Sequence, residues 1–185
     1  MKALIWLRAA ATLGCFCASV TAVTAGTTAV YEDAGKGVFE VTVPDFWTLR
    51  VGGDRDLTPS SEDELRVVER VFGLTPEKDH GVWIGLISPP RFHTLQDAKD
   101  YARSLGGQLA KTTEITSSKD RRISGYPAHV IEGTGRRDGR AVNFTVMLLD
   151  MQNSRVVVGL TVLEKGYDPN AVADINAILQ SIKAR

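Results

Sequence analysis

Three histidines are the side chains best suited to acid–base or metal chemistry in this sequence. His80 and His93 lie in predicted loops on either side of an apolar strand, and His129 lies inside a predicted strand. A metal site needs several His, Cys, Asp or Glu ligands that converge, and no histidine here has a second histidine at helical i, i+4 spacing. His129 and Glu132 are three residues apart, so they face opposite sides of a regular strand. The sequence therefore predicts no metal site.

Carboxylates stand close to two of these histidines along the chain. Asp79 precedes His80, and Asp97 follows His93 by four residues, so a hydrolase site assembled from distant loops is one alternative. However, the chain contains no Gly-x-Ser-x-Gly elbow, no His-Glu-x-x-His motif and no phosphate-binding loop. The glycines of 133–135 precede a strand and not a helix, which indicates hairpin glycines. We therefore predict no enzyme, no catalytic residue and no cofactor.

Arginines gather in the second half of the chain and form a candidate patch for an anion or an acidic partner. Acidic residues lie among them, and exposed charges interact weakly in salt, so a solvated surface is the alternative interpretation. The candidate residues are Arg121, Arg122, Arg136, Arg137 and Arg140.

Aromatic residues in two apolar segments form a second candidate site. Trp47 and Trp83 could line a ligand cleft, and with Phe144 they could line the cavity of a small-molecule or lipid carrier. Aromatic residues that alternate with apolar strand residues are also typical of a hydrophobic core. The sequence leaves both interpretations open.

The elements that must position these residues centre on 126–164 and a terminal helix over 168–185. Residues 141–150 and 155–164 alternate as two strands, which a short turn should pair in antiparallel fashion. Val146 of the first and Leu160 of the second lie on their apolar sides, and we expect Leu179 of the helix to pack there. Asp168 and Pro169 have the residue types that begin a helix.

The earlier part of the chain predicts further strands and helices. We expect a polar lead-in over 26–37, strands over 38–44 and 46–51, a short helix from Ser61 to Phe72, and a polar connection over 73–81. A buried strand over 82–87 follows, then a helix that begins near Thr94 and ends at Gly106. Residues 108–118 suggest an edge strand, and 126–132 a further strand that leads through a glycine-rich connection into 141–150.

Residues 1–25 have the pattern of a secretory signal peptide, with Lys2 and Arg8 before an uncharged, mostly apolar stretch. A retained membrane anchor and lipidation at Cys15 are the alternatives. Both cysteines lie in this segment, so the predicted mature chain, 26–185, has none. Cleavage leaves a slight acidic excess, which gives no reason to expect nucleic-acid binding.

Several segments resemble the PsbP-like and DcrB-like proteins. Residues 39–44 with 46–49 resemble their opening strand, proline and tryptophan strand; 123–128 resembles their entry to a central strand; and 178–182 resembles their closing helix. The resemblance covers nearly the whole predicted mature chain. It implies an α/β/α sandwich around an antiparallel sheet, and small proteins that act by docking. It brings no catalytic motif, so no functional residue is carried over.

We therefore expect a single α+β domain over 26–185, with a mostly antiparallel β-sheet flanked by helices on both faces. We expect an exported bacterial envelope protein, periplasmic or secreted, with no membrane span after cleavage. It should act as a binding or assembly module with a protein partner and without a cofactor. The sequence leaves the identity of the partner and the oligomeric state open.

Overall fold

The structure is a computed structural model that describes residues 26–52, 55–56, 68–69, 71–109, 113–137, 139–151 and 153–185. The predicted signal peptide, 1–25, lies outside these residues, as do Ser61 and Glu64. The helices are α1 (Leu95–Leu109) and α2 (Ala171–Gln180). The strands are β1 (Gly26–Asp33), β2 (Lys36–Pro44), β3 (Trp47–Val51), β4 (Arg55–Asp56), β5 (Val68–Glu69), β6 (Phe72–Pro76), β7 (Val82–Ile87), β8 (Glu114–Ile123), β9 (Tyr126–Arg137), β10 (Arg140–Asp150), β11 (Val156–Glu164) and β12 (Lys183–Ala184).

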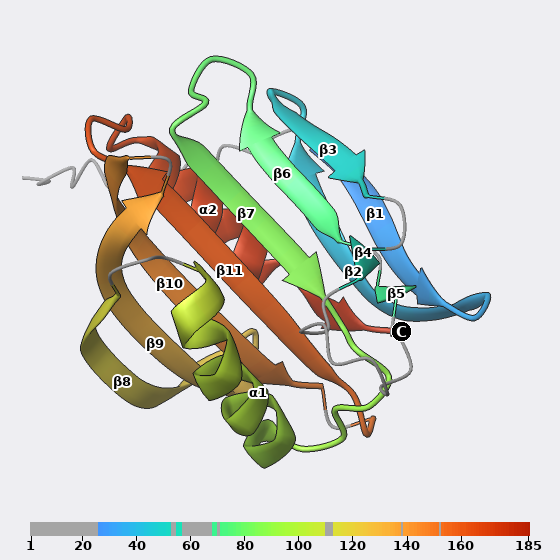
Figure 1. The fold of residues 1–185 in the computed structure, drawn as a ribbon. Coiled ribbons are helices and arrows are strands. Elements are labelled where there is room, and N and C mark those ends of the chain that lie inside the picture. Colours follow the sequence, from blue (N-terminus) through green and yellow to red (C-terminus); the bar gives the residue numbers. More distant parts are fainter. Residues whose placement is uncertain are drawn as a thin grey trace, which may run out of the picture.

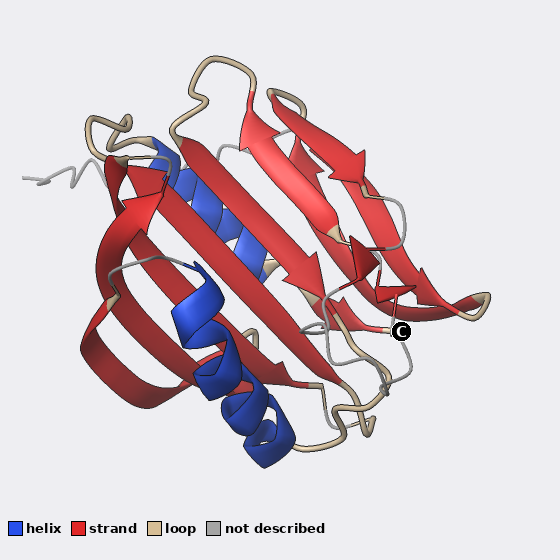
Figure 2. Ribbon diagram, in the orientation of Figure 1, coloured by secondary structure: helices blue, strands red, loops and turns tan. Residues whose placement is uncertain are grey.

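Within the described part of the chain, seven strands form one sheet in the order β3-β6-β7-β11-β10-β9-β8 (Figures 1 and 2). β1, β2 and β12 form a second sheet, and β4 pairs with β5. Neighbouring strands run antiparallel throughout. The predicted mostly antiparallel α+β fold is confirmed.

The two sides of β10 belong to different hydrophobic clusters. Val146 and Leu148 lie in a cluster with Ala98 of α1. Met147 and Leu149 lie in a larger cluster with Ile178 of α2 and with β2. Figure 1 shows α1 in front of β10 and β11, and α2 behind the sheet. These two sides of the seven-stranded sheet are called the α1 face and the α2 face below.

The expectation that the terminal helix packs on the side of the strands that carries Val146 and Leu160 is therefore wrong. Val146 and Leu160 belong to the cluster that includes α1, whereas Leu179 packs against the larger cluster. The sequence favoured the Val146 side because its residues are uniformly apolar. The other side is mixed in composition, yet Met147, Leu149 and Val157 are buried there, because α2 and the second sheet supply its apolar partners.

The predicted strands 82–87, 141–150 and 155–164 are confirmed within a residue at either end. β9 is longer than expected, because residues 133–137 continue the strand instead of forming a connection. Arg137 and Arg140 are directly paired, so the pairing of β9 with β10 continues to the end of both strands. Gly139 has a φ of 80°, a backbone conformation that glycine adopts without strain.

Three expectations in the earlier part of the chain are wrong. The predicted lead-in over 26–37 contains β1, and the predicted helix ending at Phe72 contains β5 and the start of β6. The predicted connection over 73–81 contains the rest of β6. The Phe72 ring lies 5.2 Å from that of Tyr31, which stacks on Phe39 at 4.8 Å. This aromatic cluster joins β1, β2 and β6, and such long-range packing outweighs local helix signals.

The helix boundaries also differ from the prediction. α1 continues through Gly106 to Leu109. α2 begins at Ala171, and Asp168 accepts a hydrogen bond from the backbone N–H of Asn170 at 2.9 Å. The chain leaves α2 after Gln180 and ends in β12, which pairs with β2. The predicted edge strand is confirmed as β8, although it lies later, from Glu114 to Ile123.

Glycines make room for two aromatic rings on the α1 face. An added Cβ at Gly85 would lie 2.3 Å from the Trp83 ring, so the ring covers this glycine. At Gly133 an added Cβ would lie 2.4 Å from Phe144 and 2.5 Å from the backbone oxygen of Glu114. The predicted close approach at Gly85 is therefore made by an aromatic side chain.

We predict that Gly133→Ala lowers the free energy of unfolding by about 1–3 kcal/mol, because the new methyl group meets a ring and a strand backbone. Gly73→Ala is the matched control, since its nearest atom would lie at 3.4 Å; we expect a change below about 1 kcal/mol. Urea unfolding of both variants measures the difference. Equal effects would show that Phe144 does not lie over Gly133 in solution.

Arg155 joins the two sheets at the β10–β11 turn. Its Nη1 donates to Asp33 Oδ2 at 2.8 Å, at the end of β1, and its Nη2 donates to the Ser88 carbonyl oxygen at 2.5 Å after β7. The side chain of Arg155 is 19% exposed and that of Asp33 is 33% exposed. Because both are partly withdrawn from water, the ion pair is screened less than a surface pair.

We predict that Arg155→Met lowers the free energy of unfolding by about 2 kcal/mol, because hydrogen bonds to charged groups contribute about 1.5–3 kcal/mol. Arg103→Met is the control. Arg103 pairs with Asp100 on the exposed side of α1, with the two side chains 68% and 58% exposed, and such pairs contribute about 0–1 kcal/mol. Thermal and urea unfolding would contradict the role of Arg155 if the two variants were equally stable.

Candidate functional site

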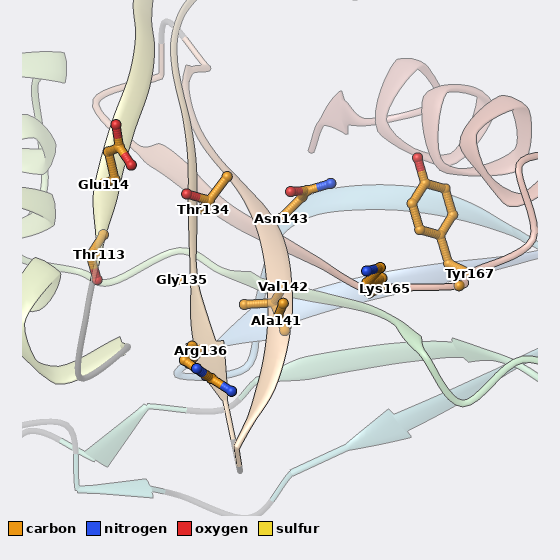
Figure 3. Close-up of a pocket in the computed structure, with 11 residues that line it drawn as sticks. Thr113, Glu114, Thr134, Gly135, Arg136, Ala141, Val142, Asn143, Lys165 and Tyr167 are labelled. Carbon is orange, nitrogen blue, oxygen red and sulfur yellow. The ribbon is translucent and has the colours of Figure 1, made fainter.

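A pocket of about 840 Å³ lies where β9 and β10 approach their hairpin, beside the segment that leaves β11. We call it the hairpin-end pocket (Figure 3). Seven of its eleven lining residues have polar or charged side chains. The lining residues are Thr113, Glu114, Thr134, Gly135, Arg136, Ala141, Val142, Asn143, Lys165, Gly166 and Tyr167.

Strand register explains why two cations flank this pocket. Arg136 is directly paired with Ala141, and the backbone N–H of Lys165 donates to the Ala141 carbonyl oxygen at 3.0 Å. Adjacent strands lie about 4.8 Å apart, so Arg136 and Lys165 stand on either side of a small residue. The methyl group of Ala141 leaves open the space that a larger side chain would fill.

The next row of the sheet adds neutral and acidic groups. Thr134 is paired with Asn143 on β10 and with Glu114 on β8, so the three side chains lie side by side (Figure 3). Tyr167, after β11, forms the opposite side of the pocket and packs partly against the larger core. The pocket therefore offers a hydroxyl, an amide and a phenol next to its two cations.

The cations differ in the hydrogen bonds and ion pairs that they already make within the protein. Arg136 Nη2 donates to the Gly139 carbonyl oxygen at 3.1 Å across the hairpin. Arg140, next to the pocket, pairs with Glu164 at 2.7 Å. The ammonium group of Lys165 has no ion-pair or hydrogen-bond partner among the described residues, and Lys165 is exposed. Lys165 is thus the cation best placed to bind something else.

The five predicted arginines do not form one patch. Arg121 and Arg122 are paired with Ala128 and Pro127 near the β8–β9 turn. Arg136, Arg137 and Arg140 lie at the β9–β10 hairpin, eight or more residues further along β9, which is about 26 Å in a strand.

The hairpin arginines are also divided between the two faces of the sheet. Consecutive strand residues point to opposite faces. Arg136 lines the pocket, whereas the guanidinium of Arg137 lies 5.8 Å from the centre of the Trp83 ring on the α1 face. Only Arg136 of the predicted set belongs to the hairpin-end pocket. Lys165 was missed because it lies between the predicted strand over 155–164 and the predicted helix over 168–185.

The predicted tryptophan cleft is not formed. Trp47 is buried in the larger core cluster. Trp83 alternates along β7 with Val82 and Ile84, which belong to that cluster, so its side chain points to the other face. Because the two rings lie on opposite faces of the sheet, they cannot line one cavity.

The carboxylates of the alternative loop hydrolase accept hydrogen bonds from the backbone instead. Asp97 Oδ2 accepts hydrogen bonds from the backbone N–H groups of His93 and Thr94, at 3.2 and 3.0 Å, at the start of α1. Asp79 accepts from the N–H groups of Gly81 and Asp168, both at 2.8 Å. The structure does not bring these groups together as a reactive set.

His129 does have polar partners, which sequence spacing did not reveal. Its Nδ1 lies 2.6 Å from Asp120 Oδ1, and its Nε2 lies 3.0 Å from Ser118 Oγ. The partners are on β8, opposite β9, so only the hairpin register could have identified them. Glu132, the neighbour considered in the sequence, is not among them.

The described residues contain no cluster of three or more potential metal ligands. No helix in this part of the chain is both long and apolar enough to span a bilayer.

No protein-family model and no curated protein sequence matches this chain. The solution structure of cyanobacterial PsbP (CyanoP) from Synechocystis sp. PCC 6803 is similar over 91% of this chain and 99% of that chain, with a TM-score of 0.51 and 13% identity. LpqN, involved in cell envelope biogenesis of Mycobacterium tuberculosis, is similar over 86% and 90%, with a TM-score of 0.45 and 13% identity. A Pseudomonas aeruginosa protein of unknown function, described as a putative regulator, is similar over 86% of this chain and 99% of that chain, with a TM-score of 0.48 and 11% identity.

The strand pairings and the two helices define the class of fold: an α+β domain built on a mostly antiparallel sheet. The similarity to CyanoP identifies it as a PsbP-like fold, which confirms the resemblance predicted from the sequence at the level of the fold. At this low identity the similarity concerns the fold alone, because one fold supports many functions.

The cap at the start of α1 predicts a pH-dependent stability. Hydrogen bonds from the Thr94 hydroxyl and the His93 N–H lower the pKa of Asp97. A carboxylate whose folded-state pKa is depressed stabilises the fold above its unfolded-state pKa, about 3.9, and loses that effect as the pH falls through the folded-state value. We therefore expect Asp97→Asn to be less stable than wild type at pH 7, and the difference to shrink below about pH 4.

Thermal unfolding of both proteins across this pH range measures the effect, with Asp100→Asn, one turn away on the same helix, as the control. A difference that stayed constant with pH would contradict the role of the Asp97 carboxylate.

Proposed function

We propose that this chain is an exported binding or assembly module of the bacterial envelope, and that the hairpin-end pocket holds an acidic group of a protein partner. The observation that supports this most directly is the pair of cations, Arg136 and Lys165, on either side of Ala141. The predicted signal peptide supports export to the periplasm or beyond. The PsbP-like fold is compatible with a docking role.

The chemistry of the lining favours a carboxylate over a neutral group. Charge-assisted hydrogen bonds from lysine or arginine to a carboxylate are about twice as strong as neutral ones. The Asn143 amide and the Thr134 hydroxyl can donate to the same oxygens. Glu114 repels anions at the β8 side, so it confines the bound carboxylate to the space between the two cations.

The role proposed for the pocket is binding without a covalent step. Its described lining contains no serine, histidine or cysteine, the residues that most often act as nucleophiles or general bases. The proposed role at this site therefore needs no cofactor and no chemical step.

We infer also that the domain is a sandwich in which the two helices cover opposite faces of the seven-stranded sheet. The support is the alternation along β10, where Val146 clusters with α1 residues and Met147 with α2 residues. In this arrangement the hairpin end of the α2 face lies beyond Ala171, the residue at which α2 begins. The pocket lies at this hairpin end.

We predict that Lys165→Glu weakens the binding of a short, fluorescently labelled poly-glutamate peptide at least about tenfold, because it removes one charge-assisted contact of about 1.5–3 kcal/mol. Fluorescence anisotropy at low salt measures the dissociation constant. Binding should also weaken as salt increases.

Lys119→Glu provides the matched control, since Lys119 is an exposed lysine of β8 outside the pocket and the change in net charge is the same. Equal losses in the two variants would mean that the peptide responds to overall charge and not to the pocket. Failure of the wild-type chain to bind the peptide at low salt would also refute the proposal.

A further inference from the structure

An aspartate, a histidine and a serine form one hydrogen-bonded chain across β8 and β9. Asp120 Oδ1 lies 2.6 Å from His129 Nδ1, and Ser118 Oγ lies 3.0 Å from His129 Nε2. The two ring nitrogens thus contact an acid on one side and a hydroxyl on the other. This is the relation in which a histidine can take the proton of a serine while a carboxylate orients the ring.

The hairpin register holds these groups in place. Asp120 is directly paired with His129, and Ser118 is paired with Ile131. Ser118 and Asp120 are two residues apart on one strand, so both side chains lie on the face that His129 occupies. The His129 side chain is only 14% exposed, and groups carried by paired strands are positioned more rigidly than groups on loops.

The electrostatic surroundings favour the ionised form of Asp120. The hydrogen bond from His129, followed by the contact with Lys99 of α1 at 3.3 Å, lowers the pKa of Asp120. A carboxylate accepts a hydrogen bond from Nδ1–H, and in that tautomer the lone pair of Nε2 is directed at the Ser118 hydroxyl.

The edge position of β8 supplies backbone donors beside the serine. Ser124 and Gly125 have φ values of 52° and 83°, as in a two-residue type I′ hairpin turn. In such a hairpin Ile123 and Tyr126 form a hydrogen-bonded pair, and hydrogen-bonded and non-hydrogen-bonded pairs then alternate. Ser118 therefore falls at a non-hydrogen-bonded position, and its backbone N–H points away from β9 toward open space at the sheet edge.

We infer that Ser118 is a nucleophile for small carboxylic esters, with His129 as general base and Asp120 as its positioning residue. Ser118 Oγ bonds to the ester carbonyl carbon as its proton passes to His129 Nε2. The ester C–O bond then breaks, and the leaving alkoxide takes that proton as the alcohol departs. Water attacks the acyl-serine in the same way and releases the carboxylic acid, which restores the free hydroxyl.

This inference goes beyond the proposed binding role and is independent of it. Ser118 and His129 lie on the α1 face, whereas Arg136 and Lys165 line the hairpin-end pocket on the other face. Loss of peptide binding in Lys165→Glu therefore leaves the serine unaffected, and loss of serine reactivity leaves the pocket unaffected.

A fluorophosphonate probe tests the inference directly, because an activated serine displaces its fluoride and keeps a stable phosphonyl group. After the full-length chain is exposed to the probe, peptide mass spectrometry should locate the adduct on Ser118. Ser118→Ala should abolish labelling, and His129→Gln and Asp120→Asn should slow it at least about a hundredfold.

Ser117→Ala is the matched control, since Ser117 is the neighbouring serine on the opposite side of β8, and it should be labelled like wild type. An adduct on any other serine, or no adduct on the folded wild-type chain, overturns the proposal. So does unchanged labelling in His129→Gln. Circular dichroism confirms that each variant is folded, and the adduct position in the wild-type chain decides the matter without any variant.

Discussion

Burial of the central strands from both sides is the constraint on which the rest of the structure depends. Val156, Val157 and Val158 of β11 are consecutive and all buried, so neither face of this strand can be left to water. Residues of one hydrophobic cluster on β10 and β11 pack with α1, and residues of the other pack with α2 and with the β1-β2-β12 sheet. The hydrophobic effect therefore fixes where both helices lie, and the strands extend as rigid supports past the region that the helices cover.

The hairpin-end pocket is a consequence of that extension. β9 and β10 continue to Arg137 and Arg140, whereas α2 begins only at Ala171, after the turn that follows β11. Toward the hairpin the α2 face changes from buried Met147 and Leu149 to exposed Asn143 and Ala141. A sheet face without a helix above it can carry polar side chains at no cost in buried polarity, so this is where binding groups can collect on a stable framework.

Local patterns in the sequence were sufficient for the elements whose residues alternate or repeat strongly, such as 82–87, 141–150 and 155–164. They failed where distant contacts decide. Phe72 belongs to a strand because it packs with Tyr31. For the same reason the site could be predicted only in part: Arg136 was found as a basic residue, but its partner Lys165 becomes visible only when Ala141 is seen between them.

The hydrogen-bonded chain of Ser118, His129 and Asp120 could not be predicted from local sequence patterns either. Along the sequence His129 is nine residues from Asp120 and eleven from Ser118, distances that match no helical or metal-binding spacing. The residues that determine the register are Ser124 and Gly125, whose positive φ values close the hairpin in two residues. A turn of a different length would shift β8 against β9, and a shift of one residue would turn Asp120 to the face opposite His129. The contacts among Ser118, His129 and Asp120 therefore depend on the Ser124–Gly125 turn, although the turn residues do not take part in the proposed chemistry.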